Sequence, residues 1–174
     1  FEIIEKIKNI LGSNHKIGIR NRSAKNSKWK DFYVLQIGSN EIVKSVSKFG
    51  IVQNKSLKIN FPKNIPEYLV GHFIRGYFDG DGSVVLGKYW RKERKNWTWA
   101  FSTRFTSGSK RFLVGLHKRL KKYISGGFIY KKKGGFDLFL SRYDSLALFR
   151  LMYHNVPTEM FLERKHDTFL RAFE

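Results

Sequence analysis

The sequence predicts an α+β protein in which helices and antiparallel hairpins occur twice in the same order. Apolar residues recur at helical spacing in several segments, while others alternate between apolar and polar residues, as paired strands do. The order helix, strand, strand, helix also repeats, with Phe32 and Asn40 matching Phe136 and Asp144 at one constant offset.

Each expected helix has one apolar face and ends near a glycine or a polar residue. The second begins at Ser39 or Asn40, either of which suits a helix N-cap. The expected helices cover 1–11, 39–50, 67–80, 109–125 and 143–154. The expected strands form hairpins: 15–22 with 31–39, the two arms of 83–107, and the two arms of 126–142, which turn at Gly134 and Gly135.

Charge is the strongest signal in the composition. The chain has 34 Lys and Arg against 14 Asp and Glu, a net charge of +20, which favours a polyanionic partner such as nucleic acid. Ribosomal proteins and basic surface-binding proteins share this charge. A hydrophobic content of 41% indicates a folded core.

The chain has no cysteine, which excludes disulfides, thiolate metal sites and a cysteine nucleophile. No apolar run approaches the ~20 residues that span a bilayer, and no signal peptide is visible. We therefore expect no membrane association and an intracellular location, in a bacterial cytoplasm or an organelle. The chain begins at Phe1, inside a helix and without Met, so we expect that the natural start is missing.

One stretch, "HFIRGYFDGDGSV" at 72–84, combines glycines and aspartates at the end of an apolar helix. Gly76 and Gly80 are four residues apart and share a helix face, where small residues let a second helix approach closely. The alternative is a glycine-rich helix end followed by a turn.

Asp79 and Asp81 lie where the helix carbonyls already make the local field negative. Carboxylates are unfavourable there unless a cation is bound, and Mg²⁺ prefers such oxygen ligands. A simple turn is the alternative. A calcium loop is disfavoured because the closing glutamate is missing.

The segment "IRGYFDGDG", 74–82, resembles the signature helix of the LAGLIDADG homing endonucleases. "NKSLKINFP", 54–62, and "FLERK", 161–165, resemble the lysine-bearing segments after each repeat of that family. With the basic strands and the internal repeat, the resemblance extends over nearly the whole chain.

The resemblance implies αββαββα repeats with saddle-shaped antiparallel sheets, of which this chain would hold about one and a half. Residues 1–66 would be a partial first repeat without its signature helix and first hairpin, and 67–174 a complete second repeat. A missing N-terminal segment, a complementing chain or a second copy would supply the other signature helix.

The implied function is site-specific cleavage of double-stranded DNA by Mg²⁺ or another divalent cation. Asp81 would be the catalytic metal ligand, and Lys55 and Lys165 would lie near the scissile phosphates unless they are ordinary surface lysines. Gly76 and Gly80 would form the helix interface, and Asp79 would support the helix end.

Strand alternation predicts a DNA-facing surface on the sheets, and the hairpin tips suit phosphate contacts. Trp90, Trp97 and Trp99 either stack on bases or, as alternating strand residues, belong to the core. The predicted DNA contacts are Lys16, Arg20, Arg22, Lys28, Lys30, Lys88, Arg91, Lys92, Arg94, Thr98, Ser102, Arg104, Lys131 and Lys133.

Two other functions fit parts of this pattern. The first is a non-cleaving relative that binds DNA or RNA, such as an intron maturase or a transcription regulator. The second is a plain basic RNA-binding or ribosomal protein, which would not need the glycine and aspartate helix. An intein is disfavoured because the chain has no nucleophilic cysteine.

Overall fold

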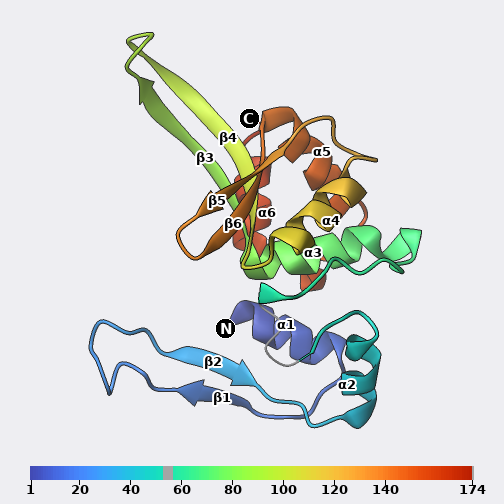
Figure 1. The fold of residues 1–174 in the computed structure, drawn as a ribbon. Coiled ribbons are helices and arrows are strands. Elements are labelled where there is room, and N and C mark those ends of the chain that lie inside the picture. The colour runs from blue at the N-terminus through green and yellow to red at the C-terminus, as the bar shows by residue number, and fades with distance from the viewer. Residues whose placement is uncertain (53–56, 174) are drawn as a thin grey trace.

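The computed structural model describes residues 1–52 and 57–173 and has two antiparallel sheets with helices packed against them (Figure 1). One sheet has two strands in the order β1-β2, and the other has four in the order β3-β4-β6-β5. The expected α+β class is therefore confirmed.

The predicted elements occur in the predicted order and several are shorter, while the two helices after residue 157 were not predicted. The helices are α1 (Glu2–Ile10), α2 (Asn40–Ser47), η2 (Glu67–Leu69), α3 (Val70–Asp81), α4 (Lys110–Leu120), α5 (Arg142–Tyr153), η3 (Thr158–Met160) and α6 (Glu163–Leu170). The strands are β1 (Ile17–Arg20), β2 (Phe32–Leu35), β3 (Gly82–Arg91), β4 (Asn96–Ser107), β5 (Phe128–Lys132) and β6 (Gly135–Leu140).

The strands of the first hairpin are shorter than predicted. Its strands were expected over 15–22 and 31–39 but pair only from Ile17 to Arg20 and from Phe32 to Leu35. The exposed polar loop between them closes partly on itself, because Ser23 donates to Asp31 from both its backbone and its hydroxyl. Ser39 is the N-cap of α2, and its Oγ accepts from the Ile42 amide at 3.2 Å.

The internal repeat is visible in the element order. The series α1, β1, β2, α2 is followed later by α4, β5, β6, α5, and between the two series stand α3, β3 and β4. In the second series β6 pairs on one side with β5 and on the other with β4, whereas β2 pairs with β1. The proposed boundary between repeats at 66/67 stays a prediction.

The buried core lies between the four-stranded sheet and the helices α3 to α6. Phe78, Phe105 and Phe169 are fully buried there. No residue of α1 or α2 is classed as buried, so the first series contributes little core. None of the described helices has the length and apolar character that a bilayer crossing requires.

The strand register assigns each side chain of the large sheet to one of two faces. Leu86 is paired with Phe101, and Gly82 with Phe105, on the face that the helices pack against, which we call the helix-covered face. Alternate residues lie on the other side, which we call the open face. The pairs Ser83 with Arg104, Val85 with Ser102, and Tyr89 with Thr98 lie on it.

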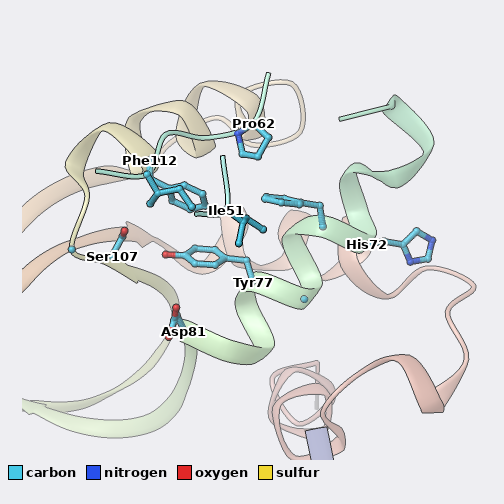
Figure 2. Close-up of a pocket in the computed structure, with 11 residues that line it drawn as sticks. Ile51, Pro62, His72, Tyr77, Asp81, Ser107 and Phe112 are labelled. Atoms are coloured by element: carbon cyan, nitrogen blue, oxygen red, sulfur yellow. The ribbon is translucent and has the colours of Figure 1, made fainter. Parts of the chain in front are cut away.

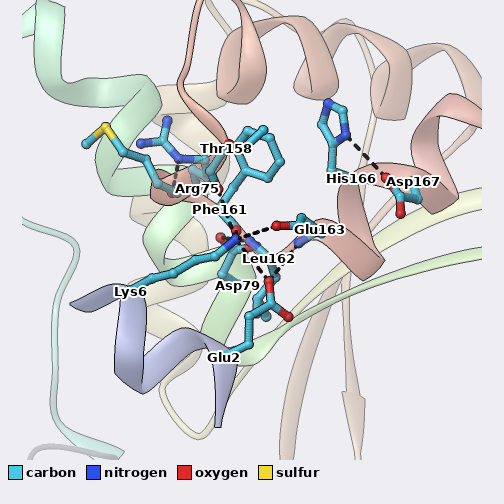
Figure 3. A network of polar contacts seen from close by, with 11 residues as sticks. Glu2, Lys6, Arg75, Asp79, Thr158, Phe161, Leu162, Glu163, His166 and Asp167 are labelled. Atoms are coloured by element: carbon cyan, nitrogen blue, oxygen red, sulfur yellow. Dashed lines mark hydrogen bonds and ion pairs between the residues drawn. The ribbon is translucent and has the colours of Figure 1, made fainter. Parts of the chain in front are cut away.

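Polar contacts fasten α1 to the C-terminal part of the chain (Figure 3). The Lys6 ammonium donates to the carbonyls of Thr158 and Phe161 at 2.9 and 2.8 Å, and it pairs with Glu163 at 3.1 Å. The Glu2 carboxylate accepts from the Glu163 amide at 3.1 Å. Helix α1 therefore lies against η3 and the N-terminal end of α6, across a groove from α3.

Candidate active site

Helix α3 is built from an apolar face and a glycine face. Val70, Ile74 and Phe78, spaced four apart, are fully buried against the core. Gly76 and Gly80 are both exposed. The helix ends at Asp81, and Gly82 continues directly into β3.

A buried arginine fixes the middle of α3 to the C-terminal segment. The Arg75 guanidinium donates to the carbonyls of Met152 and Met160 at 2.8 and 2.9 Å, and its third nitrogen lies 2.7 Å from His72 Nδ1. Burial lowers the pKa of Arg75, while the nearby Asp79 opposes that shift. Arg75 was not singled out from the sequence, although its spacing of four from Asp79 is the signal that could have found it.

Asp79 is buried, at 5% exposure, near the carboxyl end of α3, and its role in supporting the helix end stays a prediction. Its Oδ2 accepts from the Leu162 amide at 3.2 Å, at the N-terminus of α6. Its Oδ1 is buried with no hydrogen-bond partner among the described residues. Burial raises the pKa of Asp79, and the charges of Lys165 and Arg75 act in the opposite direction.

Lys165 binds the carboxyl end of α3. Its ammonium donates to the carbonyls of Phe78, Asp79 and Gly82 at 2.5, 2.9 and 2.6 Å, and the residue is 5% exposed. Helix ends leave such carbonyls without partners, so the ammonium acts as a C-terminal cap from another element. Burial lowers the pKa of Lys165 to about 8. A role of Lys165 at a scissile phosphate stays a prediction, and Lys55 lies outside the described residues.

Asp81 is the exposed acid of this helix end. It borders a mostly apolar groove of about 510 Å³, together with Gly76, Tyr77, Ser107 and Phe112 (Figure 2). The Tyr77 hydroxyl donates to the Thr106 carbonyl at 2.5 Å and so ties α3 to the end of β4. Burial raises the pKa of Tyr77 to about 12, so this hydroxyl stays protonated at neutral pH.

The glycines of α3 have different surroundings. A Cβ added to Gly71 would lie 2.5 Å from the Leu151 carbonyl oxygen, so this glycine permits the contact between α3 and α5. A Cβ added to Gly76 or Gly80 would meet no described atom within 4 Å. Both glycines therefore leave space at the helix surface, and Gly76 borders two grooves, one with Ile51 in its wall and one with Ile7 of α1.

The chemistry of Asp81 fits half of a divalent-cation site. Its carboxylate is the hard oxygen ligand that Mg²⁺ takes, and it is not consumed by the buried contacts that hold Asp79. Within 1–52 and 57–173, no group of three or more His, Cys, Asp or Glu residues is placed to hold a metal. The further ligands of a cation at Asp81 would therefore be water, a phosphate oxygen or a carboxylate of a second chain or segment.

The predicted DNA-facing residues of the large sheet are partly brought together. Thr98 and Arg104 share the open face, and the Arg104 guanidinium lies 5.7 Å from the centre of the Phe139 ring. Ser102 lies on the same face but is only 7% exposed. Lys88 differs, since its partner in the register is Trp99, on the helix-covered face.

Most other predicted contacts lie at exposed ends of hairpins. Arg20 is in β1, and Arg91, which donates to the Tyr89 hydroxyl at 2.8 Å, is at the end of β3. Lys131 is exposed in β5, and exposed loop and tip positions hold Lys16, Arg22, Lys28, Lys30, Lys92, Arg94 and Lys133.

Lys132 is a further cation on the open face, and it was not predicted from the sequence. Lys132 pairs with the buried Asp137 at 2.8 Å, and Asp137 also accepts from Thr106 at 2.7 Å and from Tyr130 at 3.1 Å. Alternation along β5 was the available signal, since Lys132 shares a face with Tyr130 whereas Lys131 does not.

No family model matches the chain, and no curated protein matches it significantly. Among solved structures, the chain is similar to the meganuclease I-SmaMI, whose crystal structure is bound to uncleavable DNA with a TTGT central four. The identity is 16% and the TM-score 0.47, and the match covers 80% of this chain and 45% of that one. The chain therefore spans less than half the length of the meganuclease that it matches, and a likeness of this size establishes neither family nor function.

Proposed function

We propose that this chain is part of a divalent-metal-dependent endonuclease of the LAGLIDADG homing type that binds double-stranded DNA. The observation that carries the proposal is the arrangement at the end of α3. Lys165 and Asp79 secure the helix end from inside, while Asp81 remains exposed beside the open face of Gly76 and Gly80. This arrangement gives the motif at 74–82 a physical function that a simple turn would not need.

In this proposal Asp81 holds Mg²⁺ or a similar cation, which supplies Lewis-acid assistance to phosphodiester hydrolysis when bound. Lys165 keeps the carboxyl end of α3 in place and thereby orients Asp81. A second signature helix, from a second copy or from another segment, covers Gly76 and Gly80 and brings an opposing carboxylate.

Duplex DNA would lie along the open face of the large sheet. Arg104, Thr98 and Lys132 offer donors there, and the exposed basic tips offer phosphate contacts. The net charge of +20 favours this partner through release of counterions.

The test is Asp81→Asn, with Glu93→Gln as a matched control that removes an exposed charge at the tip of β3 and β4. A duplex target is first selected by binding from a randomised library. Asp81→Asn should bind this duplex as the parent does and lose cleavage in Mg²⁺, while Glu93→Gln keeps both activities. Cleavage by Asp81→Asn at the parental rate would refute the assignment. Binding without cleavage in Mg²⁺ or Mn²⁺, by a parent that light scattering shows to be paired with a second copy, would identify a non-cleaving relative instead.

A further inference from the structure

The outer part of the β3–β4 hairpin exposes a row of tryptophans. Trp97 and Trp99 are 65% and 61% exposed, and Trp90 is 46% exposed. Of the two alternatives for these tryptophans, a place in the core is therefore wrong. The physical reason is visible in Figure 1, where β3 and β4 extend beyond the helices that cover the base of the sheet.

These tryptophans lie on the helix-covered side of the hairpin. Trp90 pairs with Trp97 and Lys88 with Trp99 in the register, in phase with Leu86 and Phe101 of the core. They therefore lie on the side opposite Thr98 and Arg104, the residues proposed to face duplex DNA. Whatever binds them would occupy a different surface from the duplex.

Cations accompany the indoles. The Lys88 ammonium lies 5.2 Å from the centre of the Trp99 ring, and the rings of Trp90 and Trp97 meet edge to face at 5.8 Å. Beside Trp99 is a hollow of about 280 Å³ with Leu86 and Phe101 in its wall and the guanidinium-bearing residues Arg142 and Arg171 at its border. We define the Trp surface as Lys88, Trp90, Trp97, Trp99, Arg142 and Arg171.

We propose that the Trp surface is a second nucleic-acid site, which binds unpaired bases of a single strand. Indole faces stack on bases with little sequence preference, and nearby cations contact the phosphates. Bases within a duplex already have both faces stacked, so flat exposed indoles select unpaired ones. The positive border, in a chain of net charge +20, favours a polyanion over a neutral protein surface.

The test uses the double variant Trp97→Ala/Trp99→Ala and the control Trp29→Ala. Trp29 is a comparable indole, 45% exposed and 4.7 Å from the Arg22 guanidinium, in the loop between β1 and β2. Binding of a labelled oligo(dT) and oligo(U), each about ten nucleotides long, is measured by fluorescence anisotropy. A G·C-rich duplex of equal length, which stays paired at room temperature, serves as the second probe.

The double variant should bind the single strands at least about tenfold more weakly, since stacking on each base contributes substantially. Its duplex affinity should stay within about twofold, and Trp29→Ala should change neither. Oligo(U) binding more tightly than oligo(dT) would identify RNA as the source of the strand, and the reverse would identify DNA.

Unchanged single-strand binding by the double variant would overturn the proposal, as would an equal loss for duplex and single strand. A drop in mass by light scattering without a change in oligonucleotide affinity would show instead an interface between copies. Trp97→Phe/Trp99→Phe keeps aromatic faces and should retain most of the affinity. Because these outcomes concern single strands, they are independent of whether Asp81 supports cleavage.

Discussion

Two aspartates two residues apart have opposite environments at the end of α3. Asp79 is buried near Arg75 and Lys165 and accepts a bond from α6, whereas Asp81 is exposed at the groove. A buried carboxylate is tolerated because cations compensate its charge and an amide satisfies one oxygen. The buried acid therefore serves structure, which leaves the exposed one available for a ligand.

Lys165→Met should reveal the cost of burying an ammonium. The native pKa of about 8 lies below the usual 10.5, so between these values the unfolded chain keeps a proton that the native protein has released. The free energy of unfolding therefore rises with pH between about 8 and 10.5, and below pH 8 the contribution of Lys165 to it does not change with pH. Burial is the main cause, Arg164 adds to it, and Asp79 and Asp81 oppose it.

The measurement is urea unfolding at pH 7.5 and 9.5. Near neutral pH the variant should lose at least about 2 kcal/mol, because the carbonyls of α3 lose a charged donor. The difference between parent and variant should widen at the higher pH. Lys118→Met, at an exposed position of α4, is the control and should show neither effect. Parallel pH profiles for parent and Lys165→Met would contradict the lowered pKa.

At the scale of elements, α3 uses its glycines for two different contacts. Gly71 allows the backbone of α5 to approach. A Cβ added to Gly76 or Gly80 would meet no described atom within 4 Å, and Gly76 borders the grooves that α3 shares with Ile51 and with α1. Glycine lowers helix stability by about 1 kcal/mol relative to alanine. We therefore expect each glycine of α3 to allow a close contact, either within the chain or with another molecule. Gly76 and Gly80 therefore lower the stability of α3 in the isolated chain.

Gly71→Ala and Gly76→Ala should therefore change stability in opposite directions. The first forces a Cβ to 2.5 Å from the Leu151 carbonyl and should lower Tm by about 4 °C or more. The second gains helix propensity in open space and should raise Tm by about 2–4 °C. Thermal unfolding by circular dichroism is sufficient for both. Equal losses would mean that the Gly76 face is already packed in solution.

The sequence predicted the order of elements because periodicity and glycine punctuation are local signals. Ser39 as N-cap and the turn at Gly134 follow from such signals. The sequence did not predict Lys165 as a helix cap, since its acceptors lie more than eighty residues away along the chain. It also left the tryptophans undecided, because exposure depends on how far the hairpin extends beyond the helices.

At the scale of the whole molecule, the first series of elements (α1, β1, β2, α2) contributes little to the buried core, which the later elements form. The helices α3 to α6 bury the large sheet, whereas α1 is held by polar contacts of Lys6 and Glu2. Between these parts, α3 presents its open glycine face and an apolar groove that includes Ile51 and Phe112. An apolar groove beside small residues is suited to a further helix.

From this geometry we predict that a single copy of this chain does not make double-strand breaks. It has one exposed Asp81 at an α3 end, and cleavage of both strands by the proposed chemistry needs two such acids. A second copy or a complementing segment would pair with α3 through Gly76 and Gly80. Efficient cleavage of both strands by a species that light scattering identifies as a monomer would refute this requirement.

Gly76→Leu separates pairing from chemistry, because it adds bulk to the open face and leaves Asp81 and the net charge unchanged. We expect this variant to remain folded, to be monomeric by light scattering, and to lose double-strand cleavage of the selected target. Gly38→Leu is the matched control, since Gly38 also has no described atom near an added Cβ but lies outside α3. The control should retain mass and cleavage. If Gly76→Leu cleaves both strands as the parent does, helix pairing at this face is not part of the mechanism.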